Sequence, residues 1–312
     1  KREELFEFYS LGLGDPIGVS SEQSKGFGDA LEEVCNYLKK VEEEDKGDDI
    51  KVAVVGKPNA GKSSLVNKIL GYDRTIVSDI SGTTRDAIDT PFTYKGKNFT
   101  LIDTAGIRKK KAVDEDVEYY SVIRALASVR RADVCLLVID SKEGLTEQDV
   151  KIAGYIHEQG KPSVIVMNKW DIVEKDTHTV EEFRKKLDCD LAFMDYYVAV
   201  YVSAKTGQRL EKVLDTAEKC LENARRRITT GTLNDVIADA VRMTEPPSKK
   251  GRRLKIYYST QEGIEPPTFI IFVNNKELVH FSYKRYLENV IRKTFDFSGT
   301  PIRIFFREKE EE

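Results

Sequence analysis

The stretch GKPNAGKS at residues 56–63 constrains the fold of this chain more than any other feature. It follows an apolar run at residues 51–55 and opens a helical pattern, and its G-x-x-x-x-G-K-[ST] spacing is typical of a phosphate-binding loop. Glycines let backbone N–H groups turn towards phosphates, the Lys62 ammonium reaches the outer phosphates, and the Ser63 hydroxyl can bind Mg²⁺. The stretch therefore predicts an α/β domain with a phosphate site at this loop.

Short apolar runs alternate with longer amphipathic runs over the middle of the chain. Strands are expected at residues 51–55, 92–94, 99–102, 134–139, 163–167 and 198–202, and helices at 62–70, 117–130, 147–158, 180–187 and 210–226. This order predicts a P-loop α/β domain with a mostly parallel sheet and helices on both faces. In such sheets ligands bind at the carboxyl ends of the strands.

The last quarter of the chain has a different pattern. It predicts a helix at 233–242, strands at 254–259 and 268–273, a helix at 283–294 and a strand at 302–306, which together form a small α+β domain. Residues 224–312 hold 17 Lys and Arg against 12 Asp and Glu, a net charge of +5, which leaves −8 for the preceding residues because the whole chain carries −3. A basic module on an acidic body favours a nucleic-acid partner, although a solvated surface also explains modest positive charge.

Length and composition set the domain number and the compartment. At 312 residues, with 40% hydrophobic residues, the chain favours two or three soluble globular domains. Its longest apolar runs, residues 134–139 and 164–167, are far shorter than a bilayer span, so no membrane contact is expected. The four cysteines lack metal-ligand spacing, which favours a reducing cytoplasm.

The beginning of the chain resembles the end of the predicted α/β domain. Residues 19–22 and 202–205 both follow an apolar segment with Val-Ser-[Ser/Ala]-[Glu/Lys] and precede a glycine and a helical pattern, although two unrelated turns are the alternative. An acidic, polar stretch at 41–49 reads as a linker. We therefore expect the end of a first nucleotide domain at 1–40, a linker at 41–49, a nucleotide domain at 50–223 and the basic domain at 224–312. Lys1 is not an initiator Met, so the chain is expected to be cut from a longer polypeptide.

Two further motifs suit the metal and the terminal phosphate. Asp103 directly follows the strand at 99–102 and can hold Mg²⁺, while the N–H of Gly106 can reach a γ-phosphate. The polar stretch SGTTRD at 81–86 is suited to a mobile switch, with a threonine hydroxyl completing the magnesium ligands. We favour Thr84 over Thr83 for this role.

The sequence NKWD at 168–171 predicts which base is bound. A carboxylate at Asp171 accepts hydrogen bonds from the N1–H and exocyclic amine of guanine, and adenine lacks both donors. Lys169 can lie along the base, Asn168 can tie neighbouring loops together, and the SAK sequence at 203–205 can offer N–H groups to the guanine carbonyl. These motifs, each at a strand end, predict a guanine-nucleotide site.

Together, GKPNAGKS, SGTTRD, DTAGIRKK, NKWD and SAK resemble the GTPases of the Era, MnmE and Der (EngA) group. The domain order resembles the Der family, whose members carry two G domains and a KH-like domain, with most of the first G domain lacking here. The resemblance implies a monomeric, cytoplasmic GTPase that uses GTP/GDP and Mg²⁺ and acts in assembly of the large ribosomal subunit. Its expected partners are a ribosomal subunit, ribosomal RNA and the first G domain in cis.

The resemblance also assigns roles to individual residues. Catalytic roles are expected for Asn59, Lys62, Thr84 and Gly106, and magnesium ligation for Ser63, Thr84 and Asp103. The expected nucleotide-binding residues are Gly56, Lys57, Pro58, Asn59, Ala60, Gly61, Lys62, Ser63, Ser64, Asp103, Thr104, Ala105, Gly106, Ile107, Asn168, Lys169, Trp170, Asp171, Ser203, Ala204 and Lys205.

One departure from a common GTPase pattern bears on hydrolysis. Many GTPases carry a water-orienting glutamine after the DxxG glycine, whereas this chain has Ile107. Asn59 resembles the residue that helps bind K⁺ beside the phosphates in related GTPases, although it can instead simply shape its turn. We expect slow hydrolysis that is faster in K⁺ than in Na⁺.

The role of the basic domain stays open between alternatives. KH domains commonly bind single-stranded RNA through a GXXG loop, and no two glycines after residue 224 have that spacing. The cluster at 249–253 and the cations Lys284, Arg285, Arg292 and Lys293 can still bind RNA phosphates. The alternative is a module that packs on the G domain and transmits its nucleotide state. Other hypotheses are an RNA scaffold with a structural nucleotide and an RNA-modification GTPase of the MnmE kind.

Overall fold

The computed structural model describes residues 17, 19, 49–71, 75–77, 89–104, 116–249 and 251–308. Contacts divide the chain into two units, 1–48 and 49–312. The helical pattern at 27–38 and most of the first copy of the predicted repeat lie outside the described residues. Every helix and strand that the structure describes belongs to the second unit.

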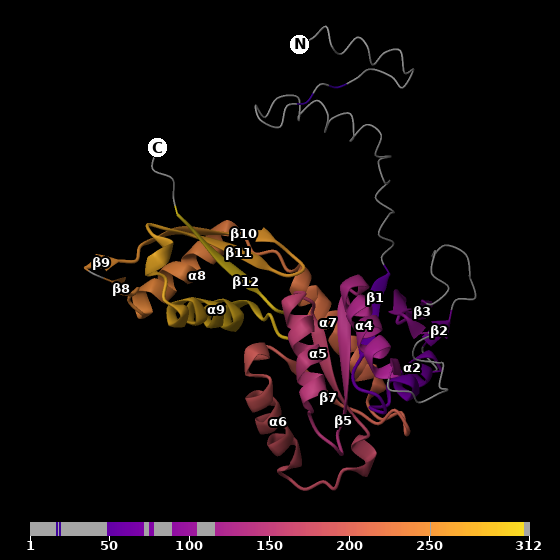
Figure 1. Cartoon of the computed structure of the whole chain (residues 1–312). Helices are drawn as coiled ribbons and strands as arrows, with labels where there is room; N and C mark the ends of the chain where they lie inside the picture. The colour runs from indigo at the N-terminus through magenta and orange to yellow at the C-terminus, as the bar shows by residue number, and fades with distance from the viewer. Residues whose placement is uncertain are drawn as a thin grey trace. The chain divides into compact units, whose positions relative to one another are not determined.

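A seven-stranded sheet forms the centre of the G domain (Figure 1). Its order is β2-β3-β4-β1-β5-β6-β7, and all pairs from β4 to β7 are parallel, whereas β2 and β3 pair antiparallel. Its strands are β1 (Ile50–Val55), β2 (Thr75–Val77), β3 (Thr90–Tyr94), β4 (Lys97–Ile102), β5 (Val134–Asp140), β6 (Ser163–Asn168) and β7 (Val198–Tyr201). The predicted mostly parallel P-loop architecture is confirmed.

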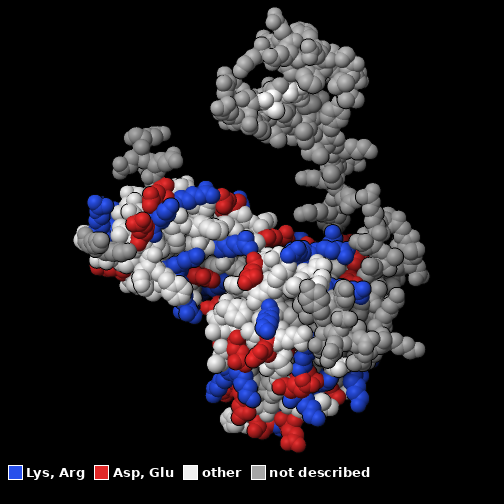
Figure 2. Space-filling view, viewed as in Figure 1, with Lys and Arg blue, Asp and Glu red and all other residues white. Residues whose placement is uncertain are grey.

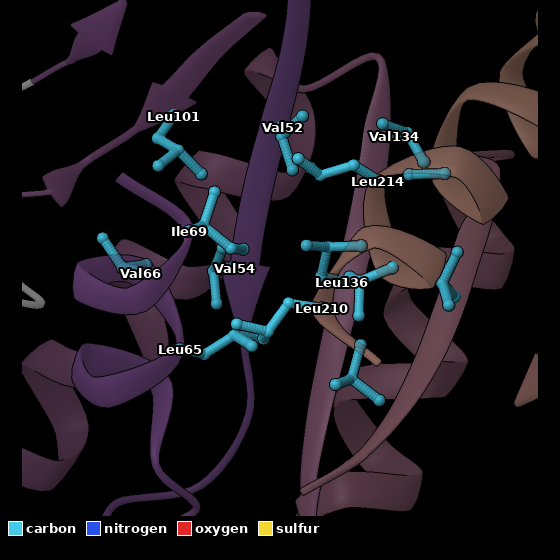
Figure 3. Packing of buried hydrophobic residues seen from close by; sticks show 14 of the residues in the cluster. Val52, Val54, Leu65, Val66, Ile69, Leu101, Val134, Leu136, Leu210 and Leu214 are labelled. Carbon is cyan, nitrogen blue, oxygen red and sulfur yellow. The ribbon is translucent and has the colours of Figure 1, made fainter. Parts of the chain in front are cut away.

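Helices cover both faces of this sheet because its parallel strands are apolar on both sides. On one face Val52, Val54 and Leu136 pack against Leu65 and Leu210, from two helices (Figure 3). On the other face Val55, Leu137 and Ile165 contact the remaining helices. The first pair is α2 (Lys62–Leu70) and α7 (Leu210–Arg225), and the second set is α4 (Asp116–Arg131), α5 (Glu147–Glu158) and α6 (Thr179–Asp190).

The second sheet belongs to the small α+β domain predicted at the end of the chain. Its order is β10-β11-β12, with an antiparallel first pair and a parallel second pair. Phe269, Ile271 and Ile304 face Leu233 and Leu287 of two helices in a separate core. The elements are α8 (Thr230–Met243), β10 (Ile256–Gly263), β11 (Thr268–Val273), α9 (Phe281–Phe295) and β12 (Arg303–Glu308).

The structure adds short elements that the sequence did not predict. β2 has three residues, and the hairpin strands β8 (Ser248–Lys249) and β9 (Arg252–Arg253) have two each, so no apolar period can develop in them. Within the described part of the chain, three short 3-10 helices are also too brief for a pattern: η2 (Trp170–Ile172), η3 (Ala192–Met194) and η4 (Lys276–Leu278). The strand predicted to start at 254 begins at Ile256. Within the described residues no helix has both the length and the apolar character to cross a bilayer.

Candidate guanine-nucleotide site

The loop after β1 has the tight backbone that a phosphate cradle requires. Gly56 has a φ of +140°, and a Cβ there would lie 2.3 Å from the carbonyl oxygen of Val138. Gly61 has a φ of +96°, and a Cβ there would lie 2.2 Å from Nδ2 of Asn168. Asn59 also has a left-handed backbone, with a φ of +62°. Only glycine fits at the first two positions, because any side chain would collide with groups of β5 and β6.

Lys62 is held inside this loop. Its Nζ donates hydrogen bonds to the carbonyl oxygens of Gly56, at 2.7 Å, and Lys57, at 2.6 Å. Burial lowers the pKa of Lys62 from 10.5 to about 8, and the Asp149 carboxylate partly opposes that shift. Carbonyl oxygens of the described residues accept the hydrogen bonds of this buried ammonium, and the negative charge of nucleotide phosphates would stabilise it more strongly than these dipoles do. The loop therefore fits an anionic ligand.

Two of the three predicted magnesium ligands, Ser63 and Asp103, lie at the same edge of the sheet. β1 and β4 are parallel neighbours, so Ser63 after β1 and Asp103 after β4 follow the same ends of adjacent strands. The Asp103 N–H donates to Oδ1 of Asp89 at 3.0 Å, which fixes the backbone at the start of the DTAG sequence. A hydroxyl and a carboxylate are the hard oxygen donors that suit Mg²⁺. Of the other predicted residues, Thr83, Thr84, Ala105, Gly106 and Ile107 lie outside the described residues.

Asn168 joins the loops around the expected base. Its Nδ2 donates to the carbonyl oxygen of Ala60 at 3.0 Å, and its Oδ1 accepts from the N–H of Ala204 at 3.0 Å. The side chain is buried, so both bonds are shielded from water. The prediction that Asn168 ties neighbouring loops together is confirmed.

A cavity of about 260 Å³ opens beside Asn168. Asp171 lines it with a partly exposed side chain, and a hydrogen bond from the Ser203 hydroxyl holds the pKa of Asp171 below its ordinary value. An ionised carboxylate can accept two donors at once, as a guanine edge requires. The cavity is lined by Gly61, Ser64, Asn168, Lys169, Asp171, Ile172, Ala204 and Lys205. Except for Ile172, all of these residues are among those predicted to bind the nucleotide.

Ion pairs connect the base loop and the P-loop to the turn after β5. Nζ of Lys169 lies 2.5 Å from Oδ2 of Asp140, whose side chain is 4% exposed. Burial raises the pKa of Asp140, but the bonds from Lys169 and the Lys142 N–H outweigh it and hold that pKa below its ordinary value. Lys57 of the P-loop is paired with Glu143 of the same turn. Sequence reasoning missed both acids, and the only signal for Asp140 was its place at the carboxyl end of a strand.

The indole of Trp170 lies in the protein interior. Its ring centroid is 4.5 Å from that of Tyr201 and 5.2 Å from that of Phe183. The backbone N–H of Trp170 donates to the carbonyl oxygen of Val202 at 2.9 Å. Trp170 therefore anchors the loop between Lys169 and Asp171 on the core, and its side chain does not line the cavity.

Comparisons with known proteins show which family the chain resembles. Residues 51–169 match the family described as 50S ribosome-binding GTPase, and residues 227–307 match the KH-domain-like C-terminal domain of EngA bacterial GTPase enzymes. The structure of Era in complex with MgGDPNP and 16S ribosomal RNA is 23% identical, with a TM-score of 0.42 over 83% of this chain and 92% of that chain.

Two curated relatives are far more similar. GTPase Der of Alkaliphilus oremlandii is 56% identical over 308 residues, which cover 98% of this chain and 70% of the relative. GTPase Der of Clostridium botulinum strain Langeland is 54% identical over 307 residues, with the same coverage of 98% and 70%. This chain therefore belongs to the GTPase Der family and is a GTPase.

Proposed function

We propose that this chain is a GTP-driven switch in assembly of the large ribosomal subunit and acts as a cytoplasmic monomer. The observation that carries this proposal is the cavity of about 260 Å³ at Asp171 beside the P-loop, in a chain whose G-domain segment matches a ribosome-binding GTPase family. Nucleotide-dependent cosedimentation with ribosomal subunits tests it. Binding to the large subunit in GTP but not in GDP is expected, and equal binding in both nucleotides would contradict a switch.

Each phosphate-contacting group has a distinct task. Lys62 would exchange its two carbonyl contacts for oxygens of the outer phosphates, and the loop N–H groups would bind the inner ones. Ser63 and Asp103 would hold Mg²⁺, which when bound neutralises charge on the phosphates. Thr84 and the N–H of Gly106 are proposed to sense the γ-phosphate.

Base selection is assigned to Asp171. An Asp171→Asn variant replaces one acceptor with an amide that can donate to the C2 carbonyl of xanthine. We expect weaker GDP binding and stronger XDP binding, measured by titration of the nucleotide-free protein. A variant that keeps its preference for GDP would place base recognition elsewhere.

Potassium stimulation is proposed to depend on Asn59. Its left-handed backbone is one that asparagine adopts more readily than most residues, so the alternative role in shaping the turn predicts the same geometry. Asn59→Gly separates the two roles, because glycine keeps that backbone and removes the side-chain oxygen. GTP hydrolysis is measured in KCl and NaCl at matched ionic strength. We expect the variant to hydrolyse GTP at the same rate in both salts. If potassium still accelerates hydrolysis in the variant, the role of Asn59 is limited to shaping the turn.

The KH-like domain is proposed to contact ribosomal RNA through exposed cations. Lys284 and Arg285 are exposed on α9. Figure 2 shows Lys and Arg interspersed with Asp and Glu over this view, which favours a local contact over attraction by a uniform basic surface. Neutralising Lys284 and Arg285 should weaken cosedimentation with subunits and leave GDP affinity unchanged.

Arg292 does not fit this role, although the sequence grouped it with those cations. Its guanidinium is 11% exposed, bonds Glu288, donates to the Thr300 carbonyl oxygen at 2.9 Å and lies 4.6 Å from the ring centroid of Tyr196. This cation therefore holds the KH-like domain to the G domain. Such contacts also support the alternative in which the domain transmits the nucleotide state.

Two further proposals concern turnover and the start of the chain. A scaffold with a structural nucleotide would bind GTP without cleaving it, so single-turnover GTP cleavage distinguishes it from the switch.

Residues 1–40 are proposed to be the end of a first G domain, which the Val-Ser repeat supports. A first domain that is present in cis would then be a regulatory partner.

A further inference from the structure

A second cavity, of about 470 Å³, lies between the G domain and the KH-like domain. It is lined on one side by Phe193, in η3 of the G domain, and on the other by Phe281 of α9 and Phe305 of β12. These three rings are 40%, 74% and 50% exposed, although phenylalanine is usually buried. Three accessible aromatic rings around one cavity offer flat apolar faces to a ligand.

The same cavity is basic at its rim. Lys284 and Arg285 of α9 line it and are exposed, and neither forms an ion pair with another described residue. Arg303 of β12 also lines it and donates to the Glu158 carbonyl oxygen at 3.0 Å, which leaves its charge without a carboxylate partner among the described residues. The lining also holds two acids, Glu288, which is paired with Arg292, and Asp195, so its three cations outnumber the one remaining carboxylate. The site therefore attracts an anion with an aromatic part.

The two walls are fixed to one another at the side of the cavity. The N–H of Gly299 donates to the Tyr196 carbonyl oxygen at 2.7 Å, and the Gly299 carbonyl oxygen accepts from the N–H of Ser163 at 2.8 Å. The Arg292 guanidinium also lies over the Tyr196 ring. Tyr196 is only three residues from Phe193, so these contacts hold the G-domain ring opposite the KH-like domain.

We propose that this cavity binds an unpaired nucleotide of RNA, with its base against Phe193 and its phosphates on Lys284 and Arg285. The inference rests on the proposed RNA partner and adds that the G domain itself supplies a base-stacking residue. Aromatic stacking combined with cations is how proteins hold single strands without a sequence code. An apolar protein segment with an aromatic anchor would leave the three cations unused, whereas RNA carries both a base and a phosphate at every nucleotide, so RNA is the better match.

The test uses the full chain and a fluorescent single-stranded RNA pool of about eight nucleotides. Loss of one stacking face lowers RNA affinity by about fivefold to 150-fold. We therefore expect Phe193→Ala to bind the RNA pool more weakly by a factor in that range. Phe193→Trp keeps an aromatic face and should bind the pool with an affinity close to that of the wild type. Met243→Ala, at a residue that is 84% exposed on α8, is the matched control and should not change RNA binding. GDP affinity and melting temperature of each variant confirm that the G domain is folded.

A second variant tests the cations. Replacing Lys284 and Arg285 with glutamine should weaken RNA binding and reduce the slope of log affinity against log salt concentration by about 1.4, since each cation contributes about 0.7 on a single strand. Wild-type affinity in Phe193→Ala would overturn the composite site, even if the double variant loses binding. A phenylalanine-containing peptide that binds where the RNA pool does not would also overturn it. Both results leave nucleotide-dependent binding to ribosomal subunits intact, whereas failure of the proposed function appears as loss of that binding in the wild type.

Discussion

Gly299 faces the thiol of Cys220 so closely that a Cβ on Gly299 would lie 2.0 Å from Sγ. Cys220 belongs to α7 of the G domain, and Gly299 lies in the loop between α9 and β12 of the KH-like domain. The neighbouring Thr300 hydroxyl donates to the Cys220 carbonyl oxygen at 2.7 Å. Close backbone approach at this glycine therefore joins the two domains.

Gly299→Ala should break this junction. The residue has a φ of +71°, which costs an alanine about 1–2 kcal/mol, and the clash with Cys220 adds about 1–3 kcal/mol. We expect a lower melting temperature and, in calorimetry, separate transitions for the two domains. Gly154→Ala is the control, because a Cβ there meets nothing within 4 Å and an α5 helix position should gain about 0.5–1 kcal/mol. A single transition at the wild-type temperature would contradict the role of Gly299.

Asn168→Ala should weaken both the fold and the nucleotide site. It leaves the Ala60 carbonyl and the Ala204 N–H without their buried partner, at about 1–3 kcal/mol for each group. Urea denaturation should show a loss of about 2–6 kcal/mol in the free energy of unfolding, and GDP affinity should fall. Asn67→Ala, at an exposed position of α2, should stay within about 0.5 kcal/mol. Equal stability of the two variants would show that the Asn168 bonds contribute little.

Stability of the nucleotide-free protein should depend on Lys62 in alkaline solution. Its pKa falls from 10.5 to about 8 on folding, so between these values the unfolded chain binds more protons than the folded one. The free energy of unfolding contributed by this residue therefore rises as pH increases from about 8 to 10.5. Nucleotide affinity should change in the opposite direction, because the phosphates need the charged ammonium.

Denaturation with urea across this pH range, with and without GDP, measures both effects. Lys62→Met should remove the alkaline rise in stability, and Lys68→Met, altered on the exposed side of the same helix, should keep it. If the free energy of unfolding depends on pH in the same way in Lys62→Met and in the wild type, the lowered pKa is contradicted. That result would mean that the carbonyl oxygens fully offset the cost of burying the ammonium.

The sequence could predict groups whose position follows from strand order, and it could not predict contacts that the fold alone creates. Asn168 and Asp171 follow a buried parallel strand, so their place at the carboxyl edge was deducible. Arg292 looked like a phosphate contact because only its charge was visible, whereas the stack on Tyr196 joins residues almost 100 apart. Asp140 and Lys169 are 29 positions apart in the sequence, and no periodic pattern of residues indicates that they pair.

Asp140→Asn should weaken guanine-nucleotide binding although Asp140 does not line the base cavity. The change leaves Lys169 without its nearly buried carboxylate partner, and a hydrogen bond between charged groups contributes about 1.5–3 kcal/mol. Lys169 would then lose its position along the base, so GDP affinity should fall by about tenfold, measured by titration, while inorganic phosphate binding stays constant.

Glu181→Gln is the control, because its pair with Lys185 spans 3.6 Å between side chains that are 64% and 74% exposed and contributes about 0–1 kcal/mol. The pKa of Asp140 lies below its ordinary value, so its contribution to stability is present above the pKa of an unfolded aspartate and is lost as pH falls through the folded value. An equal loss of GDP and phosphate binding would mean that Asp140 supports the whole loop rather than Lys169 alone.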